Sequence, residues 1–145
     1  MKVLFPSQIV PYPPHGGVLQ RGYNLVTQIA RFAEIHLLAF LHPDELPNAA
    51  AVAESHHALE KVCRSVEYFT LWPKRSRAHR LAALAMAGLS GRPFSVIAHR
   101  SRAFGGRVDG LLSSGTFDVV HVDTLGLAPY TDAWRVPSVL THHNV

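Results

Sequence analysis

The chain has 145 residues, of which 48% are hydrophobic and 17% charged, with a formal net charge of +4. This is the composition of a globular domain, which excludes a disordered or low-complexity chain, and its length allows one domain with a core of its own. A membrane-spanning helix is also excluded, because the longest apolar candidate, residues 81–89, is far shorter than the roughly 18 to 20 residues required. The first residues lack the apolar stretch of a secretory signal peptide.

The first half of the chain alternates between apolar runs and helical periodicity. Residues 2–7 form a short apolar run that predicts a buried strand, and the Pro- and Gly-rich residues 10–17 predict a loop. Apolar side chains then recur at spacings of three and four from residue 19 to about residue 33, which predicts a helix. A second strand is expected over residues 34–41.

The pattern continues with Asn48, which we expect to cap a helix from residue 49 to about residue 64. The remaining elements follow the same periodicities. They are a strand over 66–71, a helix over 76–89, a helix over 94–112 with a weak point at Gly105-Gly106, a strand over 117–122, a helical turn over 125–130 and a strand over 137–142.

Strands that alternate with helices predict an α/β fold, with a Rossmann-like parallel sheet and helices on both faces. We expect one such domain over residues 1–145. A doubly wound sheet normally continues with a helix that covers its last strand, whereas this chain ends directly after one. We therefore expect an incomplete domain.

Two other compositional features bear on the protein's surroundings. Cys63 is the single cysteine and cannot form an internal disulfide, so we expect a reducing compartment, the cytoplasm, and interpret Cys63 as a small core residue. Many basic residues lie between Arg64 and Arg107. Such a stretch can attract phosphate, nucleic acid or an anionic membrane, or can simply be a solvated helix face.

Polar residues follow three of the predicted strands. They are residues 8–17, Asp123-Thr124, and His142-His143-Asn144. In an open α/β sheet, ligands bind beyond the carboxyl ends of the strands, so we expect these clusters to converge on one edge.

Gly16 and Gly17 directly precede the first helix. Glycines let a ligand approach the backbone, and the free N–H groups of a helix start can hold a phosphate, although the pair can equally serve only to make the turn. The spacing is neither the G-x-G-x-x-G dinucleotide fingerprint nor a P-loop, since no Gly-Lys-Ser/Thr follows.

The histidines do not predict a metal site. His142 and His143 are neighbours on a strand and should point to opposite faces, while His56-His57 lies mid-helix without a further ligand at helical spacing. His121 and Asp123 should point to the same side and could form a hydrogen-bonded pair, which would suit a base or a structural tie. No G-x-S-x-G elbow is present to support a serine hydrolase.

Several motifs in their order along the chain resemble family 4 of the GT-B glycosyltransferases. The opening Met1-Lys2-Val3-Leu4-Phe5 is followed by Pro11-Tyr12-Pro13-Pro14-x-Gly16-Gly17 and by Tyr23-Asn24-Leu25. Further matching motifs are Ile35-His36-Leu37-Leu38, Ser90-Gly91-Arg92-Pro93, Phe117-Asp118-Val119-Val120-His121 and His143-Asn144-Val145. The resemblance covers essentially the whole chain.

This resemblance implies the amino-terminal, acceptor-side half of a retaining, hexosyltransferase-type enzyme that uses a nucleotide sugar and no bound metal or other cofactor. It implies that Gly16 and Gly17 approach the donor phosphates and the acceptor, and that His143, with Asn144 beside it, lies next to the reacting sugar. Asp123 stands where many relatives have His, and we include it among the binding residues. The carboxy-terminal domain that grips the donor is not among the 145 residues, so we expect this chain alone to be inactive.

The expected partners are a nucleotide sugar and a glycan or lipid-linked acceptor of cell-envelope polysaccharide synthesis, with no nucleic acid. A peripheral contact with the anionic inner face of the plasma membrane would suit the basic stretch, for which Arg75, Arg77 and Arg80 are the residues to test. Two alternatives remain open. One is a GT-B-shaped nucleotide-sugar epimerase, and the other is a non-catalytic Rossmann-like module that binds a nucleotide or a protein.

Overall fold

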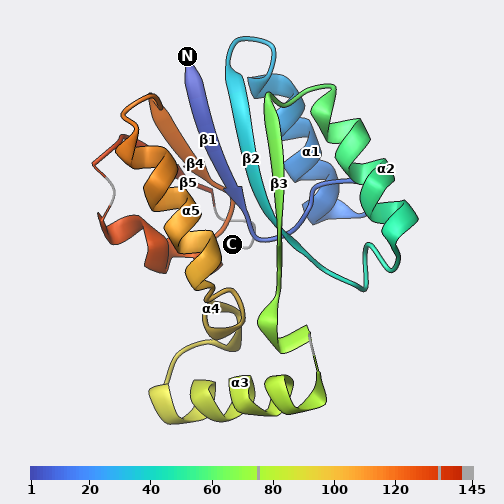
Figure 1. Cartoon of the computed structure of the whole chain (residues 1–145), viewed down its shortest axis with the longest axis vertical. Helices are drawn as coiled ribbons and strands as arrows, with labels where there is room; N and C mark the ends of the chain where they lie inside the picture. Colours follow the sequence, from blue (N-terminus) through green and yellow to red (C-terminus); the bar gives the residue numbers. More distant parts are fainter. Residues whose placement is uncertain (75, 134, 142–145) are drawn as a thin grey trace.

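The computed structural model describes residues 1–74, 76–133 and 135–141. Its five strands form one sheet in the order β3-β2-β1-β4-β5, with parallel pairing throughout. Helices flank this sheet (Figure 1), so the predicted Rossmann-like α/β fold is confirmed. The strands are β1 (Lys2–Ser7), β2 (Glu34–Leu41), β3 (Ser65–Thr70), β4 (Val119–Val122) and β5 (Ser138–Leu140).

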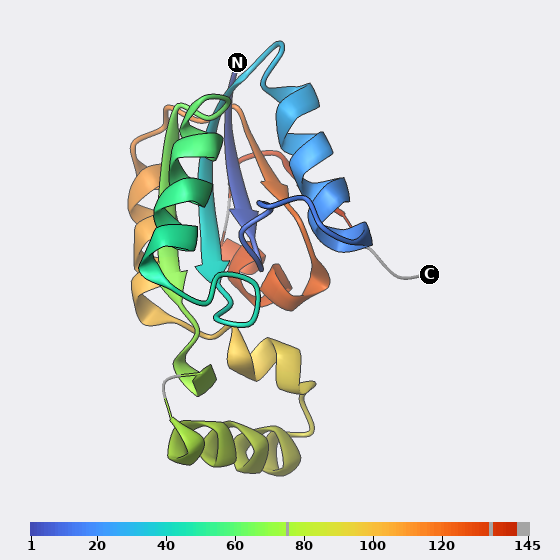
Figure 2. The same ribbon diagram turned by 90° about the vertical axis from the view of Figure 1, so that its right-hand side faces the viewer.

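Helices cover both faces of the sheet, and two further helices stand apart from these layers. α1 and α2 cover one face and α5 covers the other, while α3 and α4 lie beyond the carboxyl ends of the strands (Figures 1 and 2). The α-helices are α1 (Gly17–Ile29), α2 (Ala49–Glu60), α3 (Arg77–Ser90), α4 (Phe94–Ala98) and α5 (Arg102–Ser113), and the 3₁₀ helices are η1 (Trp72–Lys74) and η2 (Leu125–Ala133).

Each face of the sheet has its own core. In β1, Leu4 packs with Phe104 and Val108 of α5, whereas its neighbour Phe5 packs with Val26 of α1 on the other side. Because both faces of the central strands are covered, these strands are apolar at successive positions rather than at alternate ones. This explains why the apolar runs predicted the strands so closely.

Most predicted boundaries agree with the structure. Asn48 caps α2 as predicted, since its side-chain oxygen accepts a hydrogen bond from the Ala51 amide at 2.9 Å. α2 ends at Glu60 rather than near residue 64, because the Arg64 amide already bonds to the Ile35 carbonyl of β2 at 2.7 Å. α1 likewise ends at Ile29 rather than near residue 33, because the chain turns there towards the start of β2.

The single helix predicted over 94–112 is wrong. α4 ends at Ala98 and α5 begins at Arg102, with Ser101 as its N-cap, and the break is not at Gly105-Gly106. The Tyr130 hydroxyl donates to the His99 carbonyl and accepts from the Ser101 amide at 2.6 Å, so it satisfies backbone groups that the break leaves open. Gly105 lies inside α5 and lets the Tyr130 ring approach.

Cys63 is buried in the connection between α2 and β3, as its apolar surroundings predicted. Burial raises the pKa of its thiol to about 12, so the reactive thiolate is disfavoured. Among the described residues, no helix combines the length and the apolar character needed to cross a bilayer.

Candidate functional site

β1 and β4 are neighbours in the sheet, and the direction in which the chain adds strands reverses between them. From β1 the chain adds β2 and β3 on one side, and it adds β4 and β5 on the other. Such a switch point is where ligands bind in open α/β sheets. The loop after β1 and Asp123-Thr124 after β4 both lie there, as predicted, whereas His142, His143 and Asn144 lie outside the described residues.

The loop that follows β1 is folded back onto the sheet. The Val10 amide donates to the Phe40 carbonyl of β2 at 3.2 Å, and the Val10 side chain is buried. The Tyr12 ring then packs on Tyr23 of α1, with ring centroids 5.8 Å apart. These contacts hold the loop between sheet and helix and bring Gly16 to the start of α1.

Gly16 has a backbone conformation that is almost restricted to glycine. Its φ is 77° and its ψ is 168°, and as the N-cap of α1 it offers no side chain to the free amides of the first turn. A Cβ at Gly16 or at Gly17 would have no neighbour within 4 Å, so packing does not require either glycine. Backbone conformation requires the first of them, and both leave open space in front of the helix start.

A hollow of about 410 Å³ opens at this helix start. The amides of the first turn of α1 favour an anion, whereas the Glu45 carboxylate on the rim opposes one and suits hydroxyl groups. The hollow can therefore hold a ligand that carries both kinds of group. Its lining residues are Gln8, Ile9, His15, Gly16, Gly17, Val18, Leu19, His42 and Glu45.

Two histidines share one backbone carbonyl behind this hollow. The Nε2 atoms of His42 and His99 lie 3.0 and 3.2 Å from the Gln8 carbonyl oxygen. Because a carbonyl only accepts, both rings donate from Nε2. Neither ring belongs to the site residues predicted from the sequence. His42 could have been found because it directly follows β2, but nothing in the sequence indicates that His99, at the end of α4, reaches the same carbonyl.

Asp123 is almost fully buried, with 1% of its surface exposed. Its Oδ2 accepts a hydrogen bond from the Ser7 hydroxyl at 2.9 Å, which ties the end of β4 to the end of β1. Gly22 of α1 faces this carboxylate, since a Cβ there would lie 3.8 Å from Oδ2. Asp123 thus lies behind the loop and does not line the hollow at Gly16, so its geometry suits a residue that positions the loop.

His121 and Asp123 do not form the hydrogen-bonded pair that we considered. His121 Nε2 lies 2.8 Å from the Thr141 hydroxyl, and its ring stacks on Phe5 with centroids 4.9 Å apart. Both side chains lie on the α1 side of the sheet, but they have different partners. This arrangement favours a structural role for His121 rather than that of a base.

Burial also makes the stability of the domain depend on pH. It lowers the pKa of His121 below the ordinary value of 6.5, and burial followed by the nearby Lys2 charge lowers the pKa of His36. The unfolded chain therefore takes up protons at a higher pH than the folded chain does. The stability contributed by these neutral rings is complete above pH 6.5 and decreases as the pH falls from 6.5 towards the lower pKa values of the folded state.

We expect His121→Gln to reduce this loss of stability between pH 7.5 and pH 5. The measurement is urea unfolding at several pH values, and the slope of stability against pH is compared rather than its absolute value. His57→Gln, on the exposed side of α2, is the matched control and should keep the wild-type slope. An unchanged slope for His121→Gln would contradict the prediction.

No family model matches this chain, and no similar protein was found among the curated proteins or the solved structures. Across residues 1–74, 76–133 and 135–141, no group of three or more His, Cys, Asp or Glu side chains is arranged to hold a metal ion.

Proposed function

We propose that this chain is the acceptor-side, amino-terminal domain of a retaining GT-B glycosyltransferase. The enzyme would transfer a sugar from a nucleotide-sugar donor to a glycan or lipid-linked acceptor in cell-envelope polysaccharide synthesis, on the cytoplasmic side of the membrane. The observation that supports this best is the Gly16-Gly17 helix start, which opens on a hollow at the switch point of the sheet. The family's motif order and this geometry favour the same edge of the domain.

Each part of the site has a role in this proposal. The first-turn amides of α1, left open by Gly16 and Gly17, would face the donor diphosphate, and Glu45 would accept hydrogen bonds from sugar hydroxyls. Asp123 would hold the loop in place through Ser7. His143 and Asn144 enter from the resemblance alone, beside the reacting sugar.

The chemistry in this proposal needs no metal and no cofactor beyond the nucleotide-sugar substrate. Catalysis would depend on positioning the acceptor hydroxyl and on neutralising the charge of the leaving diphosphate. The residues with which the family neutralises that charge belong to the donor-binding domain. We therefore expect residues 1–145 alone to show no sugar transfer, and turnover of a nucleotide sugar by the purified chain would contradict this.

The experiment uses the complete open reading frame in which this chain lies. Release of nucleoside diphosphate from UDP- and GDP-sugars is measured with and without an extract of membrane lipids and glycans. We expect acceptor-dependent release, and we expect His143→Ala to lower turnover by about 100-fold or more. His57→Ala, exposed on α2, is the control and should keep full turnover.

Other outcomes would favour the alternatives. Conversion of the nucleotide sugar into its epimer without an acceptor would favour an epimerase, and nucleotide binding without any turnover would favour a binding module. Unchanged turnover of a folded His143→Ala variant would remove His143 from the site.

A further inference from the structure

The outer face of α3 is apolar although it faces solvent. Leu81, Leu84 and Leu89 are 67%, 48% and 90% exposed, whereas Ala83 is the buried residue of the helix. Their spacing places these leucines on the side of the helix away from Ala83. A surface helix of a globular domain normally turns its polar side outwards, so this orientation is the reverse of the usual one.

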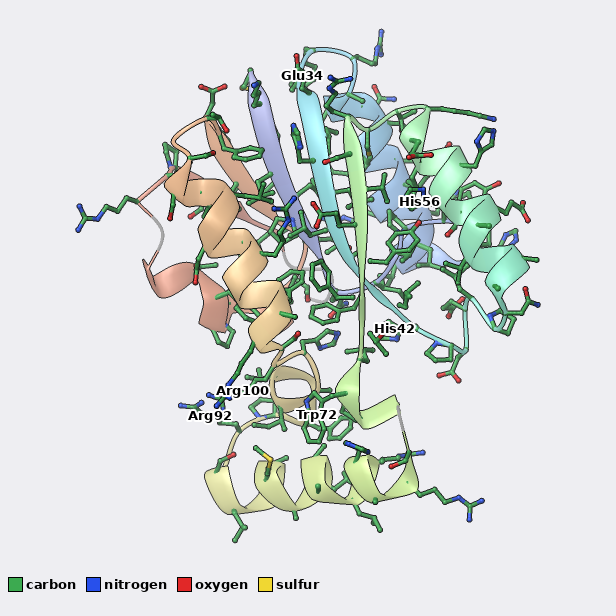
Figure 3. The ribbon with its side chains drawn as sticks, viewed as in Figure 1. Glu34, His42, His56, Trp72, Arg92 and Arg100 are labelled. Carbon is green, nitrogen blue, oxygen red and sulfur yellow. The ribbon has the colours of Figure 1, made fainter. Side chains whose placement is uncertain are left out.

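α3 is nevertheless held in a definite position. It packs on η1 and α4, and it stands apart from the two layers that cover the sheet (Figure 2). The Trp72 indole of η1 donates to the Ile97 carbonyl of α4 at 3.0 Å, which ties together the two elements that carry the helix (Figure 3). η1 and α4 therefore hold α3 in place, and its leucines are exposed at one end of the molecule.

The segment of the chain that contains this helix carries charge of one sign only. Residues 68–108 contain eight of the fourteen Lys and Arg residues and none of the ten Asp and Glu residues, so this segment has a formal charge of +8 and the rest of the chain one of −4. Arg107 pairs with Glu67, while the others that can be placed stay at the surface. Figure 3 shows Arg92 and Arg100 projecting on the same side of the α4 region. Besides Arg107, the exposed arginines of this segment are Arg77, Arg80, Arg92, Arg100 and Arg102.

We propose that α3 docks on the surface of an anionic lipid bilayer. In this arrangement Leu81, Leu84 and Leu89 enter the boundary between headgroups and acyl chains, and the surrounding arginines meet the lipid phosphates. An anionic bilayer supplies both the apolar layer and the negative charge that this surface lacks. A second copy of the chain would supply only an apolar surface, because pairing two α3 faces would bring together two segments that each have a formal charge of +8.

Docking through α3 would also place the candidate site near the membrane. α3 lies beyond the carboxyl ends of the strands, the end at which the hollow at Gly16 opens. A lipid-linked acceptor would then reach the site from the bilayer. This consequence depends on the proposed function, whereas the docking itself does not. The vesicle experiment contains no sugar, so its result tests the docking independently of the proposed function.

The test is co-sedimentation of the purified chain with vesicles of phosphatidylcholine alone or of phosphatidylcholine mixed with phosphatidylglycerol. We expect binding to the mixed vesicles only, weakening as salt screens the arginines. Leu81→Ser/Leu89→Ser and Arg77→Gln/Arg80→Gln should each weaken binding about tenfold or more. All four side chains are exposed, so the variants should fold, which circular dichroism checks.

Matched controls lie away from α3. Phe32→Ser removes a side chain that is 67% exposed in the turn before β2, and Arg21→Gln/Arg31→Gln removes two exposed charges on and after α1. Wild-type binding by both controls, with loss in both α3 variants, would support the proposal. Equal binding by all variants would overturn it. A second result would also overturn it. If the chain does not bind vesicles but forms a dimer, and Leu81→Ser/Leu89→Ser breaks that dimer, then a second copy covers α3.

Discussion

Phe104→Ala should lower the free energy of unfolding by about 3 to 5 kcal/mol, the largest effect we expect from one substitution in this chain. Phe104 has no exposed surface and lies at the centre of an aromatic cluster on the α5 side of the sheet. Its ring stacks on Phe40 at 4.6 Å, meets Phe69 edge-on at 5.1 Å and contacts Tyr130 at 5.2 Å. Removing it leaves a cavity lined by rings that cannot all move inwards.

Urea unfolding followed by circular dichroism measures this loss. Phe104→Leu keeps a large apolar side chain and should cost less than the alanine variant. Phe32→Ala is the matched control, and because its ring is 67% exposed we expect a change within about 0.5 kcal/mol. A loss below about 1 kcal/mol for Phe104→Ala would contradict a core built around this ring.

Gly16→Ala should lower the free energy of unfolding by about 1 to 3 kcal/mol, because its φ of 77° and ψ of 168° lie in a region that only glycine adopts readily. Contacts do not cause this cost, since a Cβ at Gly16 would have no neighbour within 4 Å. Gly16→Asn should cost as much, because asparagine tolerates the left-handed helical region but not this extended one. If the proposed function holds, both variants should also impair donor binding by moving the start of α1.

Gly91 provides the matched comparison. It ends α3 with a φ of 62° and a ψ of 14°, in the left-handed helical region, and it too has open space around its Cα. Gly91→Asn should therefore remain near wild-type stability, while Gly91→Ala should cost about 1 kcal/mol. Urea unfolding of the four variants tests the pattern. If Gly16→Asn proved clearly more stable than Gly16→Ala, the strain assigned to Gly16 would be wrong.

Much of the architecture could be predicted from periodicity. β1 and β2 have the predicted bounds, and Asn48 caps α2 as predicted, because these features depend on neighbouring residues. The break between α4 and α5 could not be predicted, because it depends on Tyr130, about thirty residues further along the chain. Gly105 is not the weak point that the sequence predicted, because its small size allows the contact with that ring.

The candidate site, too, could be predicted only in part. Gly16, Gly17 and Asp123 could be placed at the carboxyl edge because parallel strands bring their ends together. That Asp123 binds Ser7 and lies behind the loop, however, depends on how β4 pairs with β1 across 116 residues of chain. That His42 and His99 share the Gln8 carbonyl likewise depends on contacts between residues far apart in the sequence.

Composition and spacing along the chain are enough to predict the fold class, most of the elements and the basic stretch between Arg64 and Arg107. The strand order, the partners of Asp123 and His121, and the outward direction of the leucines of α3 depend instead on contacts between distant parts of the chain. An apolar stripe on a helix predicts burial, but whether another element covers it depends on where the chain places that helix. Here α3 lies beyond the sheet, and its leucines remain in solvent.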